Sequence, residues 1–516
     1  MNKNKKFNDK YKNRTKQKKV IQNYYEKYIK KHKNKINNLT LSNLAKSIII
    51  FGILFSKYFF NFSSSNNKRY YKKYEKGFDG NSICHEFDPI HIFETRLKND
   101  PIEICNEKNT KHICYINPKD HYNNTFRLKE GFLCIMENIV LDPSKFIESN
   151  EVFKGHVKMI NDGFPLLSKG FLNTKCNNKK IKLDNKNIYR EYFKSWNYDF
   201  NIKNENENLE ELAPGKTVFL LGRNQDSPNL YHGNCEVINV LCMLYIFNLP
   251  PEKVQLVIFS GLKIPEDPFI DLYKSIFYKN EIIFMQNLKK KYKISKAIKV
   301  PLNWDSPIFT KLPFPKCDSA MKTFKLYNDF VDKYLNLKPF KDTFISDNVN
   351  FFYPEKTIKN HEKGIKFKKI ITVQWRKVWP AHRRGQTRIL GKSRHLTSKI
   401  AESLPDNFLI RLINTAAIPY KDQISLMRNT DYLLGIHGAG LSLSIFLPKN
   451  SILHEIYAKK MNDLLTFMSA LSGHVCYSDL IKSKSYPKRG NGYVEFDEDE
   501  VIEKVLNHMK ESNFFK

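Results

Sequence analysis

One stretch near the carboxyl end constrains the fold of this chain more than any other. Residues 431–457 have the sequence DYLLGIHGAGLSLSIFLPKNSILHEIY, in which His437-Gly438-Ala439-Gly440 interrupts an apolar run of strand length. Apolar residues at helical spacing follow, and then a second strand-like run. Glycines let a ligand approach the bare main chain, and the start of the next helix offers unpaired N–H groups and the positive end of its dipole. The pattern predicts a strand–turn–helix–strand unit that binds a pyrophosphate; a tight turn that merely ends a buried strand is the alternative.

Segments of strand and helix character alternate ahead of this stretch. Residues 368–374 and 407–413 are predicted strands, and residues 393–404 and 420–427 are predicted helices. This alternation is typical of a parallel, Rossmann-like sheet, whose ligands bind at the carboxyl ends of the strands. Arg376 follows the first of these strands, and its planar guanidinium can donate paired hydrogen bonds to a diphosphate.

A second unit of the same kind lies earlier in the chain. Residues 217–222 and 254–260 are predicted strands, and residues 231–247 between them show the helical spacing of apolar residues. The two regions together predict an α/β fold with two Rossmann-like domains.

A histidine and a glutamate lie near the start of the helix in this second unit. Asn229-Leu230-Tyr231-His232 opens the helix, and Glu236 follows His232 by four positions, which places both side chains on one face. A carboxylate is normally ionised at neutral pH, so we predict that Glu236 is a general base for an incoming hydroxyl and that His232 positions it. The alternative is a His–Glu pair that only decorates a solvated helix.

The two motifs resemble the signature of glycosyltransferase family 61. In that family an HGAGL sequence precedes a Phe-Leu-Pro triplet and a strand with a glutamate, and an acidic residue follows an Asn-x-Tyr-His motif. The resemblance is clearest over residues 368–480, with a second region at 216–260. Outside the Asn-x-Tyr-His motif, the matching residues are Arg376, Arg388, Gln423, Asp431, Gly435, His437, Gly438, Ala439, Gly440, Leu441, Phe446, Leu447, Pro448 and Glu455. Many relatives carry aspartate where this chain has Glu236, which moves the carboxylate by one methylene.

The resemblance implies a GT-B-like architecture, in which two Rossmann-like domains face a cleft. It also implies an inverting transfer of a sugar, N-acetylglucosamine or a pentose, from a UDP-sugar to a hydroxyl of a protein or glycan, with no metal ion or other cofactor required. The implied donor-binding residues are Arg376, Arg388, His437, Gly438, Ala439, Gly440, Leu441 and Glu455, and Asn229 and Tyr231 would position the acceptor. A catalytically inactive nucleotide-sugar- or glycan-binding protein of the same fold is the alternative, followed by a basic nucleic-acid-binding protein.

The first part of the chain predicts attachment to a membrane. Residues 1–46 are polar and densely basic, which is typical of a disordered cytosolic tail, and residues 47–62 (SIIIFGILFSKYFFNF) are apolar enough for a signal anchor. These features predict a single-pass type II protein of the endoplasmic reticulum or Golgi membrane with a luminal catalytic domain. A cleaved signal and an amphipathic surface helix are the alternatives.

The composition shifts along the chain suggest the remaining boundaries. We predict a stem over residues 63–80, an N-terminal acceptor-side α/β domain over residues 81–350, a linker over residues 351–365 and a nucleotide-sugar-binding domain over residues 366–516. The linker is placed where the sequence turns irregular and polar.

The high positive charge does not by itself indicate a nucleic-acid partner. The formal net charge is +33, but lysine and asparagine are abundant almost everywhere, and no zinc-finger spacing or RNP-type aromatic motif accompanies the charge. The nine cysteines include no CxxC pair, which argues against a cysteine-based zinc site. The early cysteines are expected to form disulfides in a secretory compartment, or to remain buried thiols in the cytosol.

Overall fold

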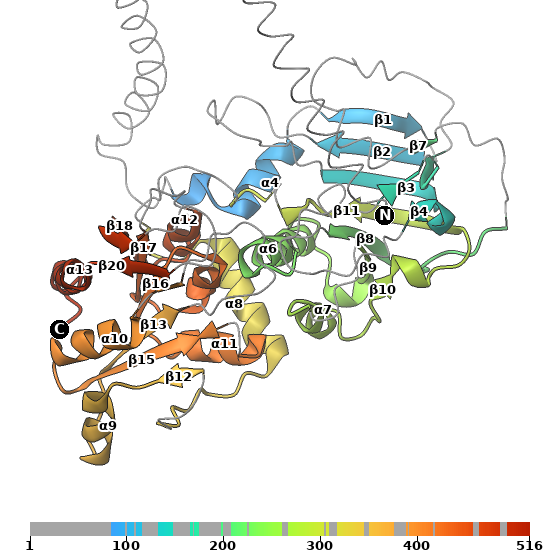
Figure 1. Ribbon diagram of the computed structural model, residues 1–516. Coiled ribbons are helices and arrows are strands. Elements are labelled where there is room, and N and C mark those ends of the chain that lie inside the picture. The colour runs from blue at the N-terminus through green and yellow to red at the C-terminus, as the bar shows by residue number, and fades with distance from the viewer. Residues whose placement is uncertain are drawn as a thin grey trace, which may run out of the picture. The chain divides into compact units, whose positions relative to one another are not determined.

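The computed structural model describes most of the chain from Cys84 onward (Figure 1). The described ranges are 84–98, 101–107, 110–115, 133–147, 166–168, 170–174, 198–199, 208–223, 227–260, 267–303, 306–308, 317–344, 350–375, 389–390, 392–415, 418–457, 464–485 and 493–515. They belong to the second of the two units into which the chain divides, residues 79–516. The predicted tail, anchor and stem over residues 1–80 lie outside the described residues. None of the helices that the structure describes is long and apolar enough to span a membrane.

The first sheet joins an antiparallel half to a parallel half (Figure 1). Its order is β1-β2-β3-β11-β8-β9-β10, with β6 and β7 attached beside β3. β11, β8, β9 and β10 pair in parallel, whereas β1, β2 and β3 pair antiparallel with one another and with β11. The strands are β1 (Ile102–Glu107), β2 (Thr110–Tyr115), β3 (Leu133–Leu141), β6 (Leu172–Thr174), β7 (Tyr198–Asp199), β8 (Thr217–Arg223), β9 (Val254–Ser260), β10 (Ile283–Phe284) and β11 (Tyr292–Lys299). The parallel pairing predicted for this region is therefore confined to one half of the sheet.

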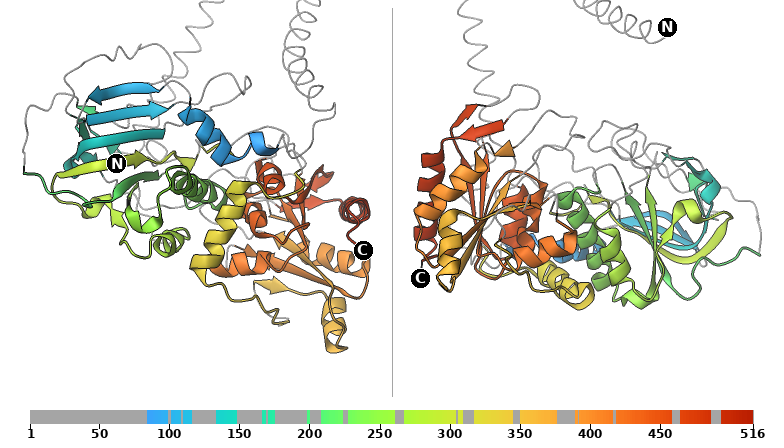
Figure 2. Two further views of the ribbon diagram at one scale, coloured as in Figure 1. Left: turned by 180° about the vertical axis from the view of Figure 1, so that it is seen from behind. Right: turned by 60° about the horizontal axis from the view of Figure 1, so that its bottom comes forward.

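Helix α6 (Leu230–Ile246) connects β8 to β9 and is apolar almost all round, so it is buried on most of its surface. It packs against α4 (Pro89–Leu97), α8 (Lys322–Leu335) and the 3-10 helix η7 (Ala439–Phe446), as the two views of Figure 2 show for α8. A single hydrophobic cluster includes residues of all four elements. The structure also describes α7 (Ile270–Ile276), which follows β9 in the chain.

The second sheet has the predicted parallel, doubly wound arrangement. Its order is β12-β15-β13-β16-β17-β18, and every neighbouring pair is parallel except β12 with β15. Numbered in chain order, the parallel strands β13, β15, β16, β17 and β18 lie in the spatial order 2-1-3-4-5, a common doubly wound order. The strands are β12 (Phe351–Phe352), β13 (Lys369–Trp375), β15 (Phe408–Asn414), β16 (Tyr432–Ile436), β17 (Ile452–Tyr457) and β18 (Val475–Leu480).

Helices and two small sheets complete the described structure. The helices of the second half are α9 (Glu355–Glu362), α10 (Ser393–Glu402), α11 (Tyr420–Met427), α12 (Leu464–Leu471) and α13 (Glu498–Glu511). The small sheets comprise β4 (Phe146–Ile147) with β5 (Leu166–Leu167), and β14 (Ile389–Leu390), β20 (Tyr493–Phe496) and β19 (Ser483–Ser485). Short 3-10 helices are η1 (Pro143–Lys145), η3 (Pro251–Lys253) and η4 (Met285–Asn287).

The segment predicted to be an irregular linker is partly regular. Phe351 and Phe352 form β12 against β15, and α9 follows directly. Pro354 precedes the first turn of α9, and Lys359 forms an ion pair with Glu355 one turn earlier, which favours helix in this polar sequence. The polar composition therefore marks an exposed helix on the second sheet rather than an irregular segment. The domain boundaries stay a prediction.

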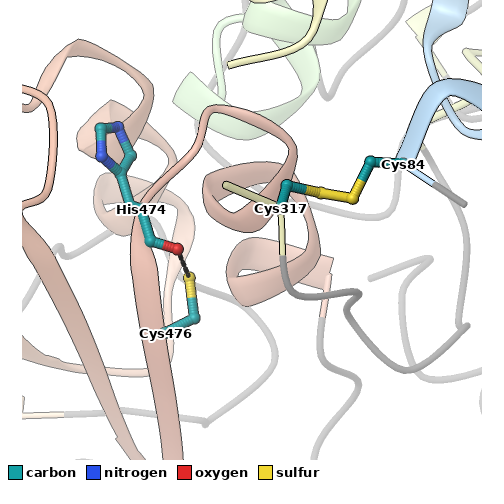
Figure 3. The surroundings of a disulfide bond; sticks show 4 residues. All are labelled: Cys84, Cys317, His474 and Cys476. Atoms are coloured by element: carbon teal, nitrogen blue, oxygen red, sulfur yellow. Dashed lines mark hydrogen bonds between the residues drawn. A yellow bond between two sulfur atoms is a disulfide. The ribbon is translucent and has the colours of Figure 1, made fainter. Parts of the chain in front are cut away.

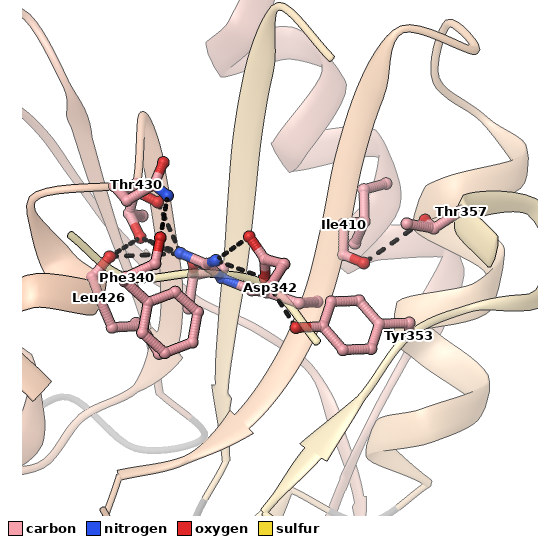
Figure 4. A network of polar contacts seen from close by, with 10 residues as sticks. Phe340, Asp342, Tyr353, Thr357, Ile410, Leu426 and Thr430 are labelled. Atoms are coloured by element: carbon pink, nitrogen blue, oxygen red, sulfur yellow. Dashed lines mark hydrogen bonds and ion pairs between the residues drawn. The ribbon is translucent and has the colours of Figure 1, made fainter. Parts of the chain in front are cut away.

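A buried arginine attaches the chain before β12 to the second sheet (Figure 4). Arg411 of β15 is fully buried and donates to both carboxylate oxygens of Asp342, at 2.7 and 2.8 Å. Asp342 also accepts a hydrogen bond of 2.6 Å from Tyr353 Oη, and the other donors of Arg411 reach Thr372 and the chain around Thr430. This closed network explains how a polar segment packs stably on the sheet.

The structure contains disulfides. Cys84, just before α4, is bonded to Cys317, ahead of α8 (Figure 3), and Cys114 on β2 is bonded to Cys134, its partner in the register with β3. Cys105 is also disulfide-bonded. Four of the early cysteines, Cys84, Cys105, Cys114 and Cys134, are therefore disulfide-bonded rather than free thiols.

Candidate active site

The Asn-x-Tyr-His motif forms the first turn of α6. The Asn229 side chain caps the helix by accepting from the Tyr231 N–H at 3.0 Å. Tyr231 is buried and its hydroxyl donates to the Ile308 carbonyl at 3.0 Å, so burial holds its pKa well above the ordinary value. His232, in contrast, is only half-buried. Asn229 and Tyr231 therefore build the start of the helix, whereas His232 lies nearer the surface.

Glu236 lies one turn further along α6 and is completely buried. It accepts hydrogen bonds from Arg223 Nε at 3.0 Å, from Asn303 Nδ2 at 3.1 Å and from the Ser227 hydroxyl. Burial raises the pKa of Glu236, and the opposing effects of Arg223 and the hydrogen bonds only partly offset this. Among the described residues no hydrogen bond joins His232 to Glu236, so the expected positioning of Glu236 by His232 does not rest on direct contact.

Arg223 connects this carboxylate to a second one. It is buried at the end of β8 and is ion-paired with both Glu236 and Asp267. Sequence analysis did not identify Arg223 or Asp267. The position of Arg223 at the end of an apolar strand could have indicated this pairing, because a buried arginine needs acidic or polar acceptors.

The HGAG turn follows β16, as predicted. The His437 N–H continues the pairing with β17 by donating to the Ile456 carbonyl at 3.0 Å, and η7 begins at Ala439. Gly438 is extended, with φ 172° and ψ 159°, which any residue can adopt. The backbone angles therefore do not require glycine at this position. Close approach of a ligand to the main chain is another reason for a glycine.

Two residues of this turn have packing roles that the sequence did not reveal. A Cβ on Gly440 would lie 1.9 Å from Gln374 Nε2, which donates to the Thr415 hydroxyl at 2.7 Å. Leu441 is buried with its side chain against Gly435. Gly440 is therefore needed to pack the turn on β13, and the side chain of Leu441 belongs to the core.

Glu455 is fully buried on β17 and its carboxylate is hydrogen-bonded to His437 Nδ1. The His437 side chain retains 12% of its exposure, against 1% for Glu455. The enclosed carboxylate of Glu455 therefore fixes the orientation of the His437 imidazole. Arg376 and Arg388 lie outside the described residues.

The strand order puts these groups at a recognised ligand-binding position. The order in which strands are added to the sheet reverses at β13, because β15 lies on one side of it and β16 on the other. Ligands of open α/β sheets bind beyond the carboxyl ends of the strands at such a switch point. Trp375 ends β13, and His437 follows β16 directly. The turn predicted to bind a diphosphate therefore lies at the edge of the sheet where open α/β folds bind ligands.

A buried polar cluster joins the two motifs. Asn234 of α6 donates to the Ser442 hydroxyl of η7 at 3.2 Å, and its carbonyl accepts from Tyr327 at 2.7 Å and Tyr420 at 2.9 Å. Ser442 in turn donates to the Ala439 carbonyl at 2.7 Å. The helix that carries His232 is thus fixed to the turn that carries His437, although the residues joined are 208 positions apart.

Comparison with known proteins agrees with this arrangement. Residues 239–453 match the family described as Glycosyltransferase 61, and this part of the chain is a glycosyltransferase family 61 domain. The match begins just after Glu236 and ends just before Glu455.

A more particular similarity is to the EGF domain-specific O-linked N-acetylglucosamine transferase of Drosophila melanogaster. The two are 23% identical over 235 residues, which cover 44% of this chain and 39% of the relative. The chain therefore matches well under half the length of that protein.

Proposed function

We propose that this protein is an inverting glycosyltransferase of the GT-B type, which transfers a sugar from a UDP-sugar to a hydroxyl of a protein or glycan. The observation that carries the proposal is the link from Asn234 to Ser442, which holds the two family motifs together. Family 61 membership and the switch point between β13 and β16 support it.

The donor diphosphate is proposed to bind over the turn after β16. His437, oriented by Glu455, and the N–H groups at the start of η7 are proposed to contact the diphosphate. Arg376 and Arg388 are proposed to add positive charge there. These groups would stabilise the negative charge that develops on the leaving nucleotide, so the transfer that we propose requires no metal ion.

His232 is proposed as the general base and Glu236 as a buried structural residue of the same helix, which reverses the ranking from the sequence. A base must reach the hydroxyl proton directly or through one water. Glu236 is enclosed by Arg223, Ser227 and Asn303, whereas His232 is half-buried in the first turn of α6. The acceptor hydroxyl would attack the anomeric carbon as its proton passes to His232, and UDP would leave from the opposite face.

The sugar is proposed to be N-acetylglucosamine, which the name of the Drosophila relative supports, or else a pentose, as the resemblance in the sequence implies. The test is a panel of nucleotide sugars offered to the full-length protein, with release of UDP and labelling of protein and glycan acceptors measured. Transfer from one UDP-sugar supports the proposal. Binding of a UDP-sugar without transfer to any acceptor would favour the inactive, sugar-binding alternative.

A luminal location in the endoplasmic reticulum or Golgi is also proposed. The disulfides support it, since such bonds persist in oxidising compartments. Protease protection in sealed microsomes tests the type II orientation, and digestion of the C-terminal domain without detergent would contradict it.

A further inference from the structure

A cluster of two histidines and an aspartate lies under the last helix of the chain. His454 of β17 and His508 of α13 each place Nε2 beside Asp479 Oδ2 of β18, at 2.9 and 2.6 Å. Their ligand atoms all lie within 4.8 Å of one another. Two imidazoles and one carboxylate converging on one point are a common ligand set for zinc.

The outer nitrogens of both histidines are also engaged. Tyr432 Oη lies 2.8 Å from His454 Nδ1, and Glu511 Oε2 lies 3.5 Å from His508 Nδ1. Metal-binding histidines almost always use their second nitrogen in this way, because the hydrogen bond fixes the tautomer and the direction of the ring. The ring of Tyr477 stacks on His508 with centroids 3.7 Å apart, which holds this imidazole further.

The cluster is separate from the candidate active site. Successive side chains of a strand point to opposite faces, so His454 lies on the face of the second sheet away from Glu455. His454 is fully buried, while the Asp479 and His508 side chains retain 16% and 12% of their exposure. One side of the cluster is therefore open enough for a water molecule.

We propose that His454, Asp479 and His508 bind one Zn²⁺ ion, with water as the fourth ligand. Each imidazole would coordinate through the lone pair of Nε2 and keep its proton on Nδ1, which His454 would donate to Tyr432 and His508 to Glu511. Tetrahedral ligands at zinc distances lie about 3.3 Å apart, so each Nε2 needs to move only about half an ångström away from Asp479 Oδ2. Imidazole ligands disfavour Mg²⁺ and Ca²⁺, which take oxygen.

Such an ion would have a structural role. It would tie α13 to β17 and β18, and so hold the strand that carries Glu455 on its other face. Lys504 Nζ, 3.6 Å from Asp479 Oδ1, is the remaining charged neighbour, and it can stay bonded to that oxygen while Oδ2 binds the metal. The alternative is a metal-free cluster in which Asp479 accepts from both Nε2–H groups.

The first test is the zinc content of the full-length protein, with zinc titrated back after chelator treatment. We expect one zinc per chain, a higher melting temperature on zinc addition, and a tetrahedral-type absorption spectrum when Co²⁺ replaces zinc. These measurements need no variant. Chelator-treated wild-type protein that takes up no zinc would overturn the proposal.

Variants locate the ion. His508→Ala and Asp479→Asn should lose stoichiometric zinc, and Tyr432→Phe should weaken zinc binding about 10- to 100-fold. The matched control is His395→Ala. It removes an exposed histidine that is bonded to Glu498, the first residue of α13, and it should leave the zinc content unchanged. Equal zinc content in His508→Ala and in the control would place the metal elsewhere and reject this site.

Discussion

At the scale of single residues, burial separates the groups able to do chemistry from those that support them. Glu236 and Glu455 both belong to the motifs found in the sequence, yet both are fully buried and bonded to other side chains. The histidines beside them, His232 and His437, are only partly buried. The carboxylates thus act through neighbouring groups, which spacing along a helix or strand does not reveal.

The proposed base gives the most direct residue-scale prediction. His232→Ala should lower the transfer rate at saturating donor by about 10²–10⁴-fold while leaving UDP affinity unchanged, because only proton removal is lost. Glu236→Gln leaves Arg223 with Asp267 as its charged partner, so it should lower the free energy of unfolding, by up to about 3 kcal/mol, more than the transfer rate of the folded fraction. Initial rates and thermal melts of both variants measure this. Normal transfer by His232→Ala with a collapse in folded Glu236→Gln would restore the original ranking.

Two glycines of the HGAG turn allow a matched comparison. The extended backbone of Gly438 accepts valine without strain, and in folded Gly438→Val the added side chain should obstruct a diphosphate at the main chain. Loss of one hydrogen bond to a charged group is worth about 1.5–3 kcal/mol, so UDP affinity should fall roughly 10- to 100-fold. Gly440→Ala should instead destabilise the fold through its clash with Gln374. Calorimetric UDP titration separates the two, and unchanged affinity in folded Gly438→Val would remove this turn from the donor site.

At the scale of elements, α6 depends on its polar contacts with η7 for its position. Ser442→Ala removes the hydroxyl that links Asn234 to the donor turn, while the two tyrosine contacts of Asn234 remain. Because small misplacements in an active site can cost as much as about 100-fold, we expect the transfer rate per folded molecule to fall markedly. The buried Asn234 amide also loses an acceptor, which should cost about 1–3 kcal/mol of stability.

The matched control for this prediction lies on the same helix. Asn239 of α6 donates to the Pro301 and Leu302 carbonyls at 3.0 Å, away from η7. Asn239→Ala should cost about 1–3 kcal/mol of stability and leave the rate per folded molecule unchanged. If Ser442→Ala transfers sugar at the wild-type rate, the link does not align the two motifs.

The accuracy of the sequence-based predictions also varies at this scale. Segments with a clear apolar pattern, such as β9 and α11, begin and end where the sequence predicted. Helix α9 was missed because its stability comes from a local ion pair and from packing on β15, which carry little periodic signal. The Arg223 and Arg411 networks were missed for a related reason: their partners lie far apart in the sequence, and only the fold brings them together.

At the scale of the whole molecule, the disulfides connect segments that the sheets do not. The Cys84–Cys317 bond joins residues 233 positions apart, so it ties the chain before α4 to the chain before α8. The Cys114–Cys134 bond spans only 20 positions between neighbouring strands. If a disulfide stabilises mainly by restricting the unfolded chain, the first should contribute more than the second, by about 2 kcal/mol.

This difference is open to measurement. The Cys84→Ala/Cys317→Ala protein should be less stable to denaturant than the Cys114→Ala/Cys134→Ala protein, and Cys242→Ala, which removes a free buried thiol, controls for cavity effects. Peptide mapping without reductant should find both bonds in protein from the secretory pathway and neither in protein made in a reducing cytosol. Because the long bond stabilises the unit that holds both motifs, the cytosolic protein should also lose transfer activity. A cytosolic product with free thiols, full stability and full activity would contradict both the structural role of the Cys84–Cys317 bond and the luminal location proposed from it.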